Sequence, residues 1–106
     1  MSGIEEIGVD KMENQFLPLG SVVLLKDATR PIVIIGFTVV EEGNPEIWDY
    51  LGCAYPIGVI DPSKNLLFQR DQIAKVLHTG YTDDEGNKFL DQLTENVKQI
   101  QNSEKN

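Results

Sequence analysis

Short runs of apolar residues, separated by polar turns, fill the chain from Leu17 to Tyr81. The most continuous run is Pro31–Val40, which is rich in Val and Ile and begins with a proline. A proline suits the first position of a strand because it has no N–H to donate to the ladder. Gly36 interrupts this run, and an isolated glycine within a strand often marks a bulge or a sharp bend. We therefore expect a buried strand here that bends near its middle.

Four more segments have the length and composition of strands, and turn residues such as those of Asp61-Pro62 separate them. The strands are expected at Ser21–Lys26, Pro31–Val40, Ile47–Tyr55, Leu66–Gln69 and Ala74–Thr79, with a single helical turn over Arg70–Ile73. Five short strands are too few for a sandwich of immunoglobulin size. The fold class is therefore mainly β, either a small curled antiparallel five-stranded sheet or an SH3-like barrel.

The pattern changes to a helical period after Tyr81. Apolar residues follow one another at spacings of three, four and three residues, which puts them on one face of a helix: Leu90, Leu93, Val97 and Ile100. Thr82 is followed three residues later by Glu85, which has the form of a capping box. We expect one C-terminal amphipathic helix. The predicted organisation is a flexible leader over 1–15, a β core over 16–81, the helix over 82–101 and a disordered tail over 102–106.

Alternation along the strands predicts which apolar side chains form the core. The expected core residues are Val23, Leu25, Val33, Ile35, Leu51, Leu67 and Val76. If the second strand is buried on both faces, Ile32 and Ile34 join them.

The charge and the cysteine content limit the possible partners and the expected cellular compartment. Seventeen acidic residues against nine basic ones give a net charge of −8. This disfavours binding to nucleic acid or to an anionic membrane surface, and it suits a basic partner. Cys53 is the single cysteine, so no disulfide can form within the chain, and no apolar run approaches the length of a membrane span. We expect a cytoplasmic protein.

The sequence holds no arrangement typical of an active site. His78 is the single histidine, and nothing near it or near Cys53 suggests a nucleophile with its base. The carboxylates of Asp49, Asp61 and Asp71 are spread along the chain, and no glycine-rich phosphate loop is present. We therefore expect no catalytic residue, no cofactor site and no metal site, and hence no enzyme.

Several segments occur in an order that resembles a known family. They are Leu17–Leu25, Ile32–Val39, Trp48–Pro56, Leu66–Phe68 and Gly80–Tyr81, of which the most specific is the Asp-Tyr-Leu-Gly-Cys-Ala-Tyr-Pro sequence within Trp48–Pro56. The chain resembles the small Gram-positive domain-of-unknown-function family 4176. The resemblance implies a cytosolic accessory protein, because members are commonly encoded beside LXG-type toxins of the type VIIb secretion system. It implies no catalytic residue.

From these patterns we expect a non-enzymatic adaptor- or chaperone-like protein that binds the helical domain of such a toxin. The predicted partner-binding residues are those of the helical stripe, Leu90, Leu93, Val97 and Ile100, together with Trp48 and Tyr50. The two aromatic residues would line a peptide groove, or else fill the core. The alternatives are an immunity protein that blocks a toxin's catalytic domain, and a general peptide-binding module. The sequence leaves homo-oligomerisation open.

Overall fold

A computed structural model describes the backbone of residues 15–105. These residues fall into two units: a sheet unit, Pro18–Tyr81, and a helical unit formed by the described residues on either side of it. Apart from Gln15, the leader expected over 1–15 lies outside the described residues.

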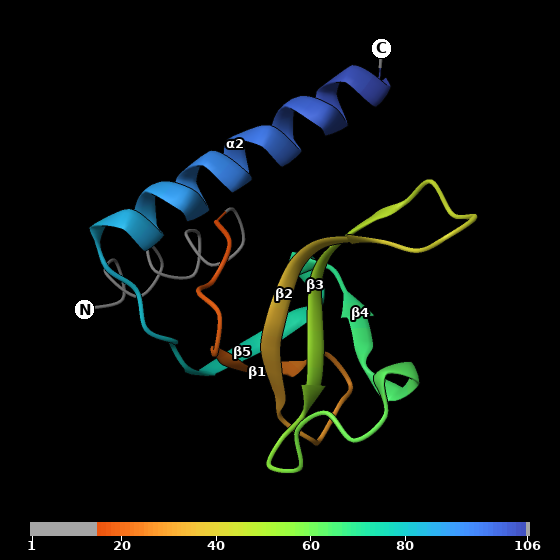
Figure 1. Ribbon diagram of the computed structural model, residues 1–106, viewed down its shortest axis with the longest axis vertical. Helices are drawn as coiled ribbons and strands as arrows, with labels where there is room; N and C mark the ends of the chain where they lie inside the picture. Colours follow the sequence, from red (N-terminus) through yellow and green to blue (C-terminus); the bar gives the residue numbers. More distant parts are fainter. Residues whose placement is uncertain (1–14, 106) are drawn as a thin grey trace. The chain divides into compact units, whose positions relative to one another are not determined.

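The sheet unit is one antiparallel sheet of five strands in the order β4-β3-β2-β1-β5. The elements are β1 (Val22–Leu25), β2 (Ile32–Val40), β3 (Ile47–Ala54), η1 (Pro62–Lys64), β4 (Leu66–Phe68), η2 (Arg70–Gln72) and β5 (Ile73–His78). All five expected strands and the helical turn before β5 are confirmed. In Figure 1, β1 and β5 cross β2 and β3 steeply, so the sheet curls. Within residues 15–105 no ladder joins β4 to β5, so the curled open sheet is confirmed and the closed barrel is wrong.

The bend in β2 comes from a bulge. Ile34 pairs with Gly52 while Gly36 pairs with Leu51, so β2 has one residue more than β3 at this point. The bulge expected at Gly36 is confirmed. The extra residue, Ile35, is exposed, and its predicted place in the core is therefore wrong.

The core of the sheet unit lies on the opposite strand faces from most of those expected. Its buried apolar side chains are Val23, Ile32, Ile34, Tyr50, Cys53 and Phe68. The ring of Tyr50 packs between Phe37 and Phe68, with centroid distances of 6.1 and 5.3 Å. Of the predicted core residues Val23 is buried, whereas Leu25, Val33, Leu51, Leu67 and Val76 are half-buried. Both faces of these strands are apolar, so alternation alone did not reveal which face points inward.

A buried serine ties the two ends of the sheet unit together. The Ser21 hydroxyl donates to the carbonyl oxygen of Pro18 at 2.7 Å and accepts the N–H of Gly80 at 2.9 Å. Gly80 must lack a side chain, because a Cβ there would overlap the carbonyl oxygen of Leu19. The segments before β1 and after β5 therefore run in close contact.

The helical unit contains α2 (Asp84–Lys105), a helix of 22 residues. Asp83 caps its start, since the Asp83 carboxylate accepts the N–H of Gly86 at 2.8 Å. The capping box predicted from Thr82 is wrong by one position, and the Thr82 hydroxyl instead donates to the Asn87 side chain at 3.1 Å. The backbone stays helical to Lys105, past the end expected at 101 and into the segment 102–106 expected to be disordered.

Candidate functional site

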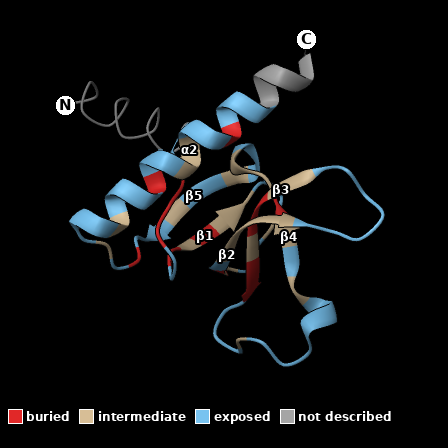
Figure 2. Ribbon diagram, turned by 45° about the horizontal axis from the view of Figure 1, so that its top comes forward, coloured by how far each residue is buried: buried red, intermediate tan, exposed pale blue. Residues whose placement is uncertain are grey.

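The first candidate surface is the predicted stripe of α2. Leu90 and Val97 are buried, Leu93 is half-buried, and Ile100 is 42% exposed. Figure 2 shows that buried and half-buried positions are few on α2 and that most of its coloured positions are exposed. The stripe is therefore covered along part of its length and open toward its C-terminal end.

Contacts inside the helical unit fix the chain next to this stripe. The backbone N–H of Phe16 donates to the Thr94 hydroxyl at 3.3 Å, and that hydroxyl donates to the carbonyl oxygen of Leu90 at 2.8 Å. The Gln15 side-chain amide lies 3.5 Å from the Asp91 carboxylate. Phe16 is buried. These contacts lie at the Leu90–Thr94 turn, which leaves the turn around Ile100 as the exposed part of the stripe.

The charged residues of α2 and its cap are mostly acidic, with most of the acids at the start of the helix. Over residues 83–100 five acids face two lysines: Asp83, Asp84, Glu85, Asp91 and Glu95 against Lys88 and Lys98. Apart from the capping Asp83, these acids lie on α2, and all of them are exposed. A partner that packs on the stripe would therefore gain from basic residues beside its own apolar face.

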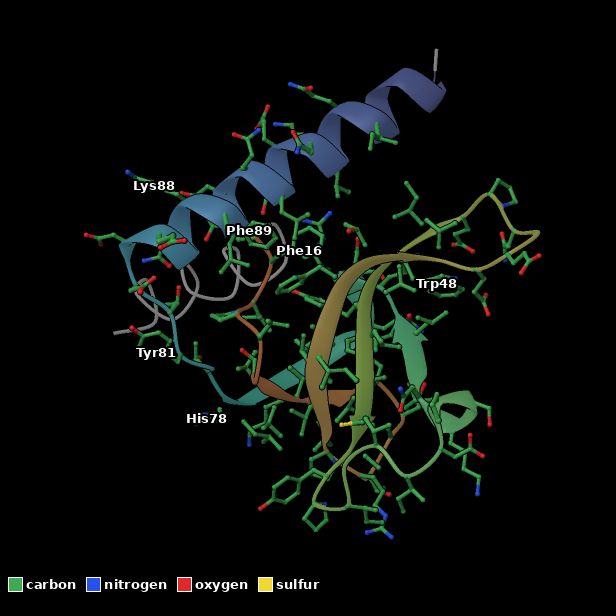
Figure 3. All side chains as sticks on the ribbon, viewed as in Figure 1. Phe16, Trp48, His78, Tyr81, Lys88 and Phe89 are labelled. Carbon is green, nitrogen blue, oxygen red and sulfur yellow. The ribbon has the colours of Figure 1, made fainter. Side chains whose placement is uncertain are left out.

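The aromatic pair on β3 does not form one surface. Tyr50 is fully buried between its two aromatic neighbours, so it has no surface to offer a partner. Trp48 is half-buried at the root of the β2–β3 hairpin, as Figure 3 shows. Its indole Nε1 is buried and has no hydrogen-bond partner among the described residues. Only Trp48 therefore remains as a surface candidate.

The one buried carboxylate of the sheet unit has a structural role. Asp49 accepts the backbone N–H of Arg70 at 2.8 Å and pairs with the Arg70 side chain at 3.3 Å. The Gln69 side chain accepts the Asp49 N–H at 3.0 Å and donates to the Ile47 carbonyl oxygen at 3.2 Å, which continues the β3–β4 ladder by one more step. These contacts fix η2 against β3. Sequence reasoning missed this role because the partners are about 20 residues apart.

The candidate nucleophile and base are kept apart. Cys53 is buried on β3, whereas His78 is exposed near the end of β5 (Figure 3). Strands β2 and β1 lie between them, so the thiol and the imidazole do not form a nucleophile–base pair. Among the described residues no three His, Cys, Asp or Glu side chains gather as metal ligands would. No helix of the described chain has the length and apolar content to cross a membrane.

A second candidate surface was not predicted from the sequence. The connection from β3 to β4 carries four apolar side chains that are each more than half exposed: Tyr55, Ile57, Val59 and Ile60. We call these four residues the apolar loop. The N–H of Gly58 donates to the Ala54 carbonyl oxygen at 2.8 Å, and that of Tyr55 donates to the Pro31 carbonyl oxygen at 3.2 Å. The sequence signal for the apolar loop is the absence of any charge from Ala54 to Ile60, which is unusual for a loop.

The molecule is a small, mainly β protein with a C-terminal helix and two partly exposed apolar surfaces. A family model described as a domain of unknown function (DUF4176) matches residues 16–89, and the chain belongs to this family. The match spans the whole sheet unit and ends at Phe89, so the apolar stripe of α2 lies beyond it. No curated protein and no solved structure matches the chain.

Proposed function

We propose that this DUF4176 protein is a non-enzymatic, adaptor- or chaperone-like protein that binds a helical segment of a partner through α2. The observation that carries the proposal is the incompletely covered stripe, which ends in the exposed Ile100. Two helices pack side by side when each presents apolar residues at spacings of three and four. The stripe offers that spacing to a partner helix.

The acidic surroundings of the stripe define the partner further. Five acids against two lysines over residues 83–100 favour a helix that carries Lys or Arg beside its apolar face. Such charges act chiefly on the choice of partner and on the association rate, while the apolar contact supplies most of the affinity.

We also propose that the partner is an LXG-type toxin of a type VIIb secretion system, bound in the cytoplasm through its helical domain. This part rests on the resemblance of the chain to a family whose members are commonly encoded beside such toxins. A basic helix in that domain would match the acidic flanks of α2.

A second candidate, an immunity protein, has its own supporting observation. The β2–β3 hairpin ends in the exposed carboxylates Glu41 and Glu42, next to Val40, which is 60% exposed. An acidic tip of this kind can enter the basic substrate site of a toxin's catalytic domain. In that case the catalytic domain of a neighbouring toxin would co-purify with this protein, and the helical domain would not.

The experiment compares Ile100→Asp with Gln99→Asp in binding to the helical domain of a toxin encoded next to this protein. Both changes add one negative charge to adjacent exposed positions of α2, but only the first places it on the stripe. We expect Ile100→Asp to weaken binding at least about tenfold, because a charge at an apolar contact must be desolvated. Titration calorimetry measures the affinity, and circular dichroism checks that α2 persists. Equal affinities for the two variants would refute the α2 contact.

A further inference from the structure

We infer that the apolar loop of the sheet unit is a second docking surface, which takes an acidic amphipathic helix of a partner protein. Its occupant differs in charge from the basic helix proposed for α2. The inference uses the sheet unit alone and does not depend on the proposed function of α2.

The apolar side chains are presented to solvent by a fixed backbone. Four large apolar side chains lie within the six residues from Tyr55 to Ile60, and the side chain of Ile60 is 76% exposed. Backbone hydrogen bonds at Tyr55 and Gly58 hold the loop, and the φ angle of +83° at Gly58 favours a glycine. Single exposed apolar residues are ordinary, but four on one short loop are more than that, and exposed apolar groups are typical of interaction sites.

Unpaired cations flank the apolar loop. Arg30 precedes Pro31, whose carbonyl oxygen accepts the Tyr55 N–H, and Lys64 lies in η1, which follows the loop directly. Both cations are exposed, and neither forms an ion pair within the part of the chain that is described. Asp61, the acid between Ile60 and η1, accepts the Ser63 N–H at 3.0 Å and the Ser63 hydroxyl at 2.9 Å. Both donors are neutral, so the charges next to the loop are two cations and one carboxylate.

The opposite end of the β2–β3 pair has the opposite charge. Ile32 pairs with Ala54 beside the apolar loop, whereas Val40 pairs with Ile47 beside the acidic hairpin. The hairpin carries Glu41, Glu42 and Glu46, all exposed. In a chain of net charge −8, the excess of one positive charge that Arg30, Lys64 and Asp61 leave beside an apolar group favours an occupant with carboxylates.

Two other occupants fit these charges less well. Lipid-binding basic clusters use about four to eight Lys or Arg, and an anionic bilayer would repel a chain of net charge −8. A second copy that docked loop against loop across a two-fold axis would bring Arg30 and Lys64 of one copy close to the same two cations of the other. A partner helix with Asp or Glu beside its apolar face meets both cations with opposite charge.

The test uses two synthetic helical peptides of about 18 residues, or five turns. They share one stripe of Leu and Ile and carry either Glu or Lys beside it. Fluorescence anisotropy measures their binding to the full-length protein. We expect the apolar loop to bind the Glu peptide about fivefold more tightly than the Lys peptide, the effect of two exposed ion pairs. The apolar stripe of α2 lies on an acidic helix and should have the opposite preference, so the charge of the bound peptide distinguishes the two surfaces.

Variants assign the binding to the loop. Ile57→Ser with Ile60→Ser should weaken the Glu peptide at least about tenfold. The matched control is Val40→Ser, which removes an equally exposed apolar side chain at the other end of β2 and should leave the affinity unchanged. Replacing Arg30 and Lys64 by Glu should reverse the preference in favour of the Lys peptide.

Several results would overturn the inference. One is no binding of the Glu peptide, and another is binding that survives the double serine change. Loop-dependent binding to phosphatidylserine vesicles would identify a membrane as the occupant instead. A dimer that sedimentation detects in the wild type but not in the double serine variant would identify a second copy instead.

Discussion

The sheet core and the apolar loop contain the same kinds of apolar side chain, but those of the core are buried and those of the loop are exposed to solvent. Ile34 and Tyr50 are fully buried among residues of neighbouring strands, whereas Ile57 and Ile60 stand in solvent on a loop held by its own backbone bonds. Removing apolar area from water stabilises the fold in the first case. In the second case the apolar area is still in contact with water, so burying it against a partner would stabilise a complex. In the sheet unit, the apolar side chains that stabilise the fold and those proposed to bind are therefore separate sets.

The largest expected effect separates two neighbours on β2. Ile34→Ala should lower the free energy of unfolding by about 2–5 kcal/mol, because it leaves a cavity in the core. Ile35→Ala, at the exposed bulge position, should cost below about 1 kcal/mol. Urea denaturation of both variants measures the difference. Equal losses would show that the bulge does not set the inward face of β2.

The next effect concerns the polar tie between the ends of the sheet unit. Ser21→Ala leaves the Gly80 N–H and the Pro18 carbonyl oxygen without their hydroxyl partner, and should cost about 1–3 kcal/mol. Ser63→Ala is the control, since its hydroxyl lies on an exposed turn and the change should cost less than about 0.5 kcal/mol. Thermal unfolding compares the two. A Ser21→Ala protein as stable as the control would contradict this tie.

The smallest effect concerns the start of α2. Asp83→Ala should lower stability by about 1 kcal/mol through loss of the N-cap. Thr82→Ala should cost less, because Thr82 does not cap the helix. Helical circular dichroism against temperature gives both values. A larger loss of stability from Thr82→Ala than from Asp83→Ala would show that Thr82 is the N-cap, as expected from the sequence.

Local signals in the sequence predicted the elements of this fold well. Polar turns separate the strands, and the stripe of α2 has apolar residues at spacings of three and four. The strands and the helix could therefore be predicted directly from the sequence. The inward face of β2 could not, because Val33 and Ile35 are as apolar as Ile32 and Ile34. The spacing of Thr82 and Glu85 also predicted a cap one residue before the actual cap, Asp83.

The candidate surfaces were predicted less completely than the fold. The α2 stripe follows from periodicity, but the exposure of Ile100 depends on where other residues pack. Tyr50 is of a residue type that is common in binding sites. It nevertheless lies in the core, because its neighbours Phe37 and Phe68 enclose it. The apolar loop differs in sequence from an ordinary loop by its lack of charge, but an uncharged apolar segment also suits a buried strand end. Its exposure depends on which residues pack near it, which the sequence alone does not reveal.

Hydrogen exchange of the full-length protein, alone and with the helical domain of the neighbouring toxin, tests the central proposal most directly. If α2 binds that domain through its stripe, the amides from Leu90 to Ile100 should exchange more slowly in the complex, because docking suppresses local opening of the helix. Unchanged exchange in α2, with slowing confined to the β2–β3 hairpin and obtained with the toxin's catalytic domain, would contradict the account and favour the immunity protein.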